Sequence, residues 1–156
     1  MKRLLIPFLF IINSFGWNFL PHSDNSRPKI KVNIWDKNQF NNKKFISITP
    51  GGIAGFYSLG ISSYILNNYD ISNYSFIGAS AGAWISLVCC YKHDHNKFIN
   101  NLLKLDIFDN CKGSVSKLQY DLYNYLTENY KTEDFDFDKL HICISELKKT
   151  PTIVTN

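Results

Sequence analysis

The chain has 156 residues, of which 45% are hydrophobic and 15% aromatic, and it carries 17 basic and 13 acidic side chains. This length fits a single domain, and the apolar share excludes a wholly disordered chain. The basic residues form no run of five or more, so no nucleic-acid partner is expected. The four cysteines form no C-x-x-C pair, which leaves a zinc ribbon or a thioredoxin-like motif unsupported.

The amino terminus has the pattern of a secretory leader. Lys2 and Arg3 precede a run of nine mostly apolar residues, which is too short for an ordinary membrane-spanning helix. We therefore expect residues 1–16 to be a signal peptide or hydrophobic anchor, with cleavage after Gly16, and residues 17–42 to be a polar linker. A buried strand is the alternative for the apolar run. The expected location is the secretory pathway or a membrane or lipid-droplet surface.

From residue 43 the pattern is that of alternating strands and helices. Residues 45–49 predict a strand that stops at a glycine-rich turn, and residues 75–77 predict a second one. Between them, four apolar residues recur at helical spacing: Tyr57, Ile61, Tyr64 and Ile65. Residues 81–91 are apolar almost all round, which predicts a helix buried on every side.

The second half of the chain predicts two further helices and then strands. Asp94 is a good N-cap for a helix with apolar residues at 98, 99, 102 and 103, and residues 115–126 form another amphipathic pattern. Residues 141–147 alternate as a strand does, and a turn at 148–151 leads to a β-prone end at 152–155. The order of elements predicts an α/β fold.

Residues 78–82 match the pattern G-x-S-x-G. A serine on a sharp strand-to-helix turn projects its hydroxyl from the sheet edge, and the flanking glycines permit close backbone approach. The N-terminus of the following helix favours a developing oxyanion. The predicted strand before Ser80 and the predicted buried helix after it are the context that this motif needs.

A second glycine motif, residues 51–55, also lies between a strand and a helix. Backbone N–H groups in such a turn can bind an anion. The six residues from Pro50 do not fit a Rossmann fingerprint, and the Lys and Ser/Thr of a P-loop are missing. A plain tight turn is the alternative interpretation.

Together the two motifs resemble the patatin-like phospholipase family, over a stretch from Phe45 to Ala83. Residues 52–55 and 77–83 are most similar to its adipose triglyceride lipase and adiponutrin subgroup, and residues 140–155 are similar to the strand–turn–strand found there. The resemblance implies a three-layer α/β sandwich with a central, largely parallel sheet. Residues 43–156 would be the N-terminal part of that domain, truncated at its C-terminus.

The resemblance also implies a serine lipid acyl hydrolase with a Ser–Asp dyad and no cofactor or metal. Ser80 would be the catalytic nucleophile, between the elbow glycines Gly78 and Gly82. Four residues would supply the oxyanion hole: Gly51, Gly52, Ile53 and, through the N–H after the nucleophile, Ala81. The substrate would be a lipid acyl ester at a membrane or lipid-droplet surface.

The sequence departs from the family pattern at three points. Pro50, which has no N–H, stands where the family commonly has its first glycine. Ala54 stands where plant and bacterial members often have a basic residue. The catalytic aspartate belongs to a D-G-G or D-G-A motif downstream of the elbow, and these 156 residues contain no Asp-Gly pair. We therefore expect a fragment of a longer hydrolase or an inactive form that binds lipid or a protein partner.

Three other patterns are weaker candidates. His93 and His95 lack an evident third ligand for a metal. Together with His141 they raise an α/β-hydrolase triad as an alternative. The acidic segment 133–138 lacks the glycine and glutamate of an EF-hand at the required positions, so a solvated loop or edge strand is expected there.

Overall fold

The computed structural model of the chain describes residues 43–144 and 152–155. The predicted leader (1–16), the predicted linker (17–42) and the predicted turn at 148–151 lie outside these residues. Among the described helices there is none with the length and apolarity that a membrane crossing requires.

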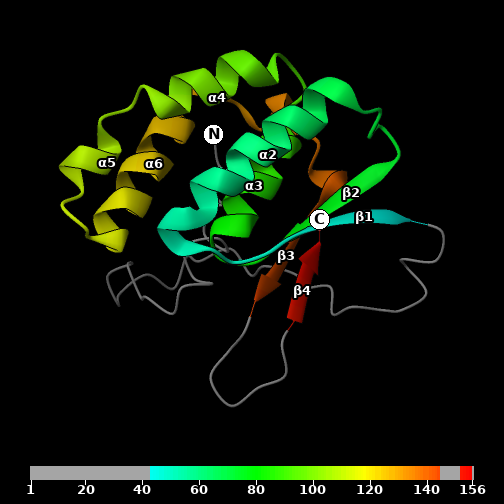
Figure 1. Cartoon of the computed structure of the whole chain (residues 1–156), viewed down its shortest axis with the longest axis horizontal. Coiled ribbons are helices and arrows are strands. Elements are labelled where there is room, and N and C mark those ends of the chain that lie inside the picture. The colour runs from blue at the N-terminus through cyan, green and yellow to red at the C-terminus, as the bar shows by residue number, and fades with distance from the viewer. Residues whose placement is uncertain (1–42, 145–151, 156) are drawn as a thin grey trace, which may run out of the picture.

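A four-stranded sheet organises the described part of the chain (Figure 1). Its strands lie in chain order: β1 (Lys44–Ile48), β2 (Tyr74–Gly78), β3 (Leu140–Ile144) and β4 (Thr152–Thr155). The first three are parallel and β4 is antiparallel to β3. The register pairs Ile48 with Gly78 and Gly78 with Ile142, so the carboxyl ends of the parallel strands meet at one edge. The predicted α/β class is confirmed.

The helices lie together on one side of this sheet (Figure 1). They are α2 (Gly55–Asn68), α3 (Ala81–Cys89), α4 (His95–Leu103), α5 (Ile107–Asn110) and α6 (Val115–Asn129). Three short 3-10 turns accompany them: η2 (Gly52–Ala54), η3 (Thr132–Asp134) and η4 (Phe137–Lys139). Ser114 caps α6 and Asp94 caps α4, the latter by accepting a 2.9 Å hydrogen bond from the Lys97 N–H. The predicted cap at Asp94 is confirmed.

Helix α3 forms the centre of the core, as its almost entirely apolar sequence predicts. It packs against β1, β2 and β3 on one side and against α2 and α4 on the other. Its one buried hydroxyl, that of Ser86, donates to the Gly82 carbonyl at 2.8 Å. Cys89, the last residue of α3, and Cys90, which follows it, are also buried. Burial raises the pKa of the Cys89 thiol to about 12. Both cysteines are therefore core residues and poor nucleophiles.

Helix α2 has the predicted extent, but its apolar stripe faces outward. Three of the four predicted stripe residues are exposed: Tyr57 by 81%, Ile61 by 61% and Tyr64 by 60%. The buried positions of α2 are Gly55, Leu59 and Ser62. Because two of these are small, α2 can lie close against α3, and this steric requirement decides which side is buried. Apolar periodicity alone indicates the wrong face.

Candidate active site

The sheet register brings the two glycine motifs together. Ile48, the last residue of β1, lies beside Gly78, the last residue of β2. The turn that follows β1 therefore lies next to the turn that carries Ser80. The two turns are in close contact at Gly55 and Ala81, because a methyl group on Gly55 would lie only 2.7 Å from the Cβ of Ala81.

Ser80 occupies a sharp turn between β2 and α3. Its φ of 54° and ψ of −127° lie in a region that residues other than glycine rarely adopt. Ser80 directly precedes the first residue of α3, and its side chain makes no capping hydrogen bond. Ser80 is half-buried. This is the local geometry that a strand-to-helix nucleophile turn requires.

The two flanking glycines are required by close backbone contacts. A Cβ on Gly78 would collide with the carbonyl of Gly82 and with the Ser86 hydroxyl. A Cβ on Gly82 would collide with the carbonyls of Ile48 and Thr49. Both glycines of the G-x-S-x-G pattern are therefore explained by packing between α3 and the ends of β1 and β2.

One backbone N–H group beside Ser80, that of Ala81, is available to a ligand. The N–H groups of Gly82 and Ala83 donate to the carbonyls of Ala79 and Ser80. The Ala81 N–H, by contrast, has no backbone acceptor among the described residues. It lies at the N-terminus of α3, where the helix dipole favours negative charge.

The first glycine turn supplies further candidate donors. Gly51 and Gly52 are exposed, and Gly52 has a φ of 53°, which glycine adopts without strain. Ile53 follows inside η2. The structure thus brings all the predicted oxyanion residues to the same edge of the sheet as Ser80.

An apolar cavity of about 130 Å³ begins at this edge. Gly52 and Ala81 form part of its wall beside Ser80, and Gly52 is exposed, so this end reaches the surface. The cavity continues between α2, α3, α4 and α6, where its walls are mostly large apolar side chains, among them Phe56, Trp84 and Leu122. Its volume is close to that of a cavity of about 150 Å³ that accepts benzene. It can therefore accommodate a short segment of hydrocarbon chain.

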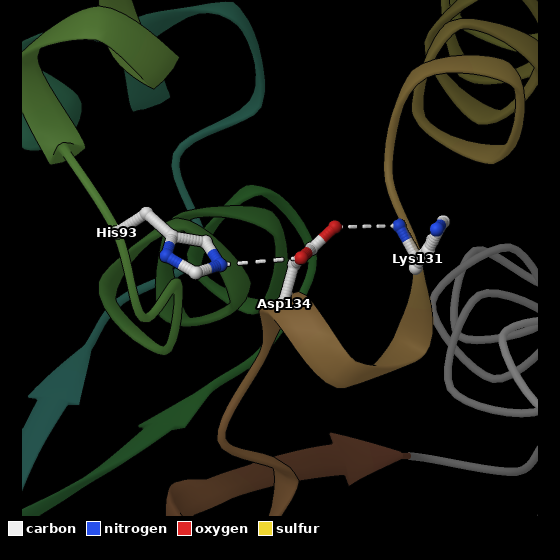
Figure 2. Close-up of polar contacts among 3 residues, drawn as sticks. All are labelled: His93, Lys131 and Asp134. Atoms are coloured by element: carbon white, nitrogen blue, oxygen red, sulfur yellow. Dashed lines mark hydrogen bonds and ion pairs between the residues drawn. The ribbon is translucent and has the colours of Figure 1, made fainter.

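The histidines lie away from Ser80. His93 and His95 follow the C-terminal end of α3, and the nine residues of that helix span about 13 Å. His93 instead meets the carboxylate of Asp134, with Nε2 3.2 Å from Oδ1, as Figure 2 shows. The other carboxylate oxygen of Asp134 accepts from the Lys131 N–H at 2.7 Å. This backbone bond, with a smaller effect from His93, lowers the pKa of Asp134.

His141 is buried on the side of the sheet that faces away from α3. Its neighbours Leu140 and Ile142 belong to the core beneath the helices, so the alternation of the strand directs His141 to the opposite side. There its ring lies 5.2 Å from that of Phe45. Burial, with a smaller effect from Lys43, lowers its pKa to about 4. This placement disfavours an α/β-hydrolase triad that uses His141.

The acidic segment forms short turns and holds no metal-binding arrangement. Its residues lie in η3 and η4, and between them Phe135 is 2% exposed and pairs with Tyr91 in a short antiparallel bridge. Within the described residues, no three His, Cys, Asp or Glu side chains are grouped as metal ligands.

No family model, curated protein or solved structure matches this chain.

Sequence reasoning missed one polar residue of the cavity. Gln119, on α6, is 5% exposed and lines the cavity among apolar side chains. The sequence around it indicates this position only in part. Gln119 lies one residue from Leu118 and three from Leu122, on the face of α6 that packs inward. A polar residue on the apolar side of a helix is the signal that could have identified it.

Proposed function

We propose that this chain is a patatin-like serine acyl hydrolase that forms an acyl-enzyme on Ser80. The observation that carries the proposal is the strained turn of Ser80 between β2 and α3, packed against the glycine turn after β1. A three-layer patatin-like sandwich, of which residues 43–156 form the N-terminal part, belongs to the same proposal. The resemblance and the geometry of the turn at Ser80 both support it.

The proposed reaction has two steps. The Ser80 oxygen attacks the ester carbonyl carbon, the serine proton passes to the leaving alcohol, and the bond between carbonyl carbon and alcohol oxygen breaks. Water then attacks the acyl-serine, releasing the fatty acid and restoring the hydroxyl. The N–H groups of Ala81 and of the Gly51–Gly52 turn would stabilise the oxyanion in both steps. The resemblance assigns the proton transfers to an aspartate of an Asp-Gly pair, which these 156 residues do not contain.

Labelling with a fluorophosphonate tests the assignment of Ser80. The wild-type protein should be labelled, and Ser80→Ala should lose labelling. Ser72→Ala, which changes an exposed serine before the start of β2, at the opposite end of that strand from the elbow, is the matched control and should label normally. Equal labelling of Ser80→Ala and wild type would overturn the site assignment.

A lipid surface is the proposed source of the substrate. Helix α2 begins at the cavity mouth, contains no charged residue, and exposes Tyr57, Ile61 and Tyr64 at i, i+4 and i+7. Tyrosine side chains are enriched at the boundary between water and lipid, and the isoleucine adds apolar area to this face. Ile61→Asp should reduce cosedimentation with phosphatidylcholine vesicles, whereas Asn100→Asp, an exposed change on α4, should not. Equal binding of the two variants would exclude α2 as the lipid-facing surface.

The second candidate function is a catalytically inactive domain that binds lipid or a protein partner. The missing Asp-Gly pair favours it, because an unassisted serine hydroxyl is a poor nucleophile near neutral pH. Reading the coding sequence past Asn156 discriminates between the two. A D-G-G or D-G-A motif after further strands supports the hydrolase, and a stop codon supports the inactive domain.

A further inference from the structure

The side chain of Gln119 is an unusual component of the cavity wall. It is 5% exposed, and apart from the indole of Trp84 it brings the only polar side-chain atoms among the lining residues. Its Nε2 is fully buried and has no hydrogen-bond partner among the described residues. A buried amide that donates to nothing is unfavourable, and a leucine at this position would avoid the cost.

The surroundings of Gln119 explain why the fold itself does not pair this amide. Its neighbours on the cavity-facing side of α6 are Leu118, Leu122 and Leu126, and the facing walls are apolar residues such as Phe56 and Leu102. None of these side chains offers a hydrogen-bond acceptor. The described cavity wall therefore offers Gln119 no side-chain acceptor, and an acceptor carried by an occupant of the cavity would pair with its amide.

We propose that the cavity selects an acyl chain that bears an oxygen function, to which Gln119 Nε2 donates a hydrogen bond. This inference rests on the proposed acyl-ester function, because it takes the cavity as the place where the acyl chain lies. The preferred ligand is an oxygenated fatty acyl group, with a hydroxyl, keto or epoxide oxygen in an otherwise apolar chain. A plain saturated chain fills the same apolar walls but leaves the amide unpaired, so it binds less tightly.

The experiment compares dodecanoate with monohydroxy dodecanoates in which the hydroxyl is moved along the chain, by calorimetric titration of the 156-residue protein. At the position opposite Gln119, the hydroxy acid should bind about fivefold more tightly than dodecanoate, as one net hydrogen bond provides. Gln119→Leu should erase that preference and bind dodecanoate at least as well as wild type does. Tyr120→Leu, an exposed change at the next position of α6, should retain the preference.

Two results of the binding experiment would overturn the proposal: no hydroxyl position is preferred, or the preference survives in Gln119→Leu. Thermal unfolding provides a second measurement. Gln119→Leu should melt at the wild-type temperature or a few degrees above it, as expected when an unpaired buried amide is removed. A clear fall in melting temperature would mean that Gln119 has a structural role instead.

Failure of the proposed function gives a different result. If Ser80 is not catalytic, fluorophosphonate labelling fails while the binding preference and its loss in Gln119→Leu persist. If labelling succeeds and the preference is absent, only the role of Gln119 is wrong. Ser80→Ala should keep the binding preference in either case.

Discussion

Gly55 and Ala81 lie so close that a methyl group on Gly55 would approach the Cβ of Ala81 to 2.7 Å. Gly55 is the first residue of α2, directly after the first glycine turn, and Ala81 directly follows Ser80. Their contact therefore fixes the distance between the two turns that make up the candidate active site. Any side chain at position 55 would push these turns apart.

Gly55→Ala should destabilise the fold by about 1–3 kcal/mol, the usual cost of overpacking a tight contact. Gly60→Ala is the matched control on the same helix, because a Cβ there would have no heavy atom within 4 Å. Alanine in a helix interior should stabilise by about 0.5–1 kcal/mol. Urea unfolding of the two variants measures the difference, and similar free energies of unfolding would contradict the close contact.

The two sides of α2 should respond differently to truncation. Leu59 is 5% exposed, so Leu59→Ala should cost about 2–5 kcal/mol of unfolding free energy. Ile61 is 61% exposed, so Ile61→Ala should change that free energy by less than about 0.5 kcal/mol. Thermal or urea unfolding checks both. A larger loss at Ile61 than at Leu59 would show that α2 packs with its other face inward.

Much of the fold could be predicted from local pattern. The apolar run of α3, the cap at Asp94 and the two strand-to-turn junctions follow from residue type and spacing. The face of α2 could not be predicted, because its contact with α3 depends on small residues such as Gly55 and Ser62. Small side chains carry little weight in an apolar periodicity, although they decide how closely two helices can approach.

The candidate site was predictable only in part. The G-x-S-x-G pattern singled out Ser80, whereas the strand register was needed to bring the first glycine turn beside it. The cavity could not be predicted, because α2, α3, α4 and α6 all contribute to its wall. Gln119 was not predicted for the same reason. A single glutamine within α6 can be recognised as part of a cavity wall only when the residues that face it are known.

The backbone strain at Ser80 should be measurable in the free energy of unfolding. Glycine adopts a φ of 54° freely, whereas serine and alanine do not, and such strain costs about 1–3 kcal/mol. We expect Ser80→Gly to unfold at higher urea than Ser80→Ala, although neither should label with a fluorophosphonate. At Ser72, which has no positive φ, the order should reverse, with Ser72→Gly less stable than Ser72→Ala. The same order at both positions would argue against strain at Ser80.

Burial of His141 should make the fold less stable in mild acid. Burial lowers the pKa of this imidazole to about 4 in the folded protein, from an ordinary value of 6.5. The unfolded chain therefore binds a proton first as the pH falls, so this stability is present above about pH 6.5 and is lost towards about pH 4. Between about pH 7 and about pH 5 the loss from this group should be ~1–2 kcal/mol.

Urea unfolding of wild type and His141→Phe across this pH range measures the effect of His141. Phenylalanine keeps an aromatic ring against Phe45, so the variant should fold and show a shallower loss of stability in acid. The half-buried His95, whose pKa is also lowered by burial, leaves a residual slope of the same sign in both proteins. If His141→Phe loses as much stability as wild type between about pH 7 and about pH 5, the buried neutral imidazole is not the cause.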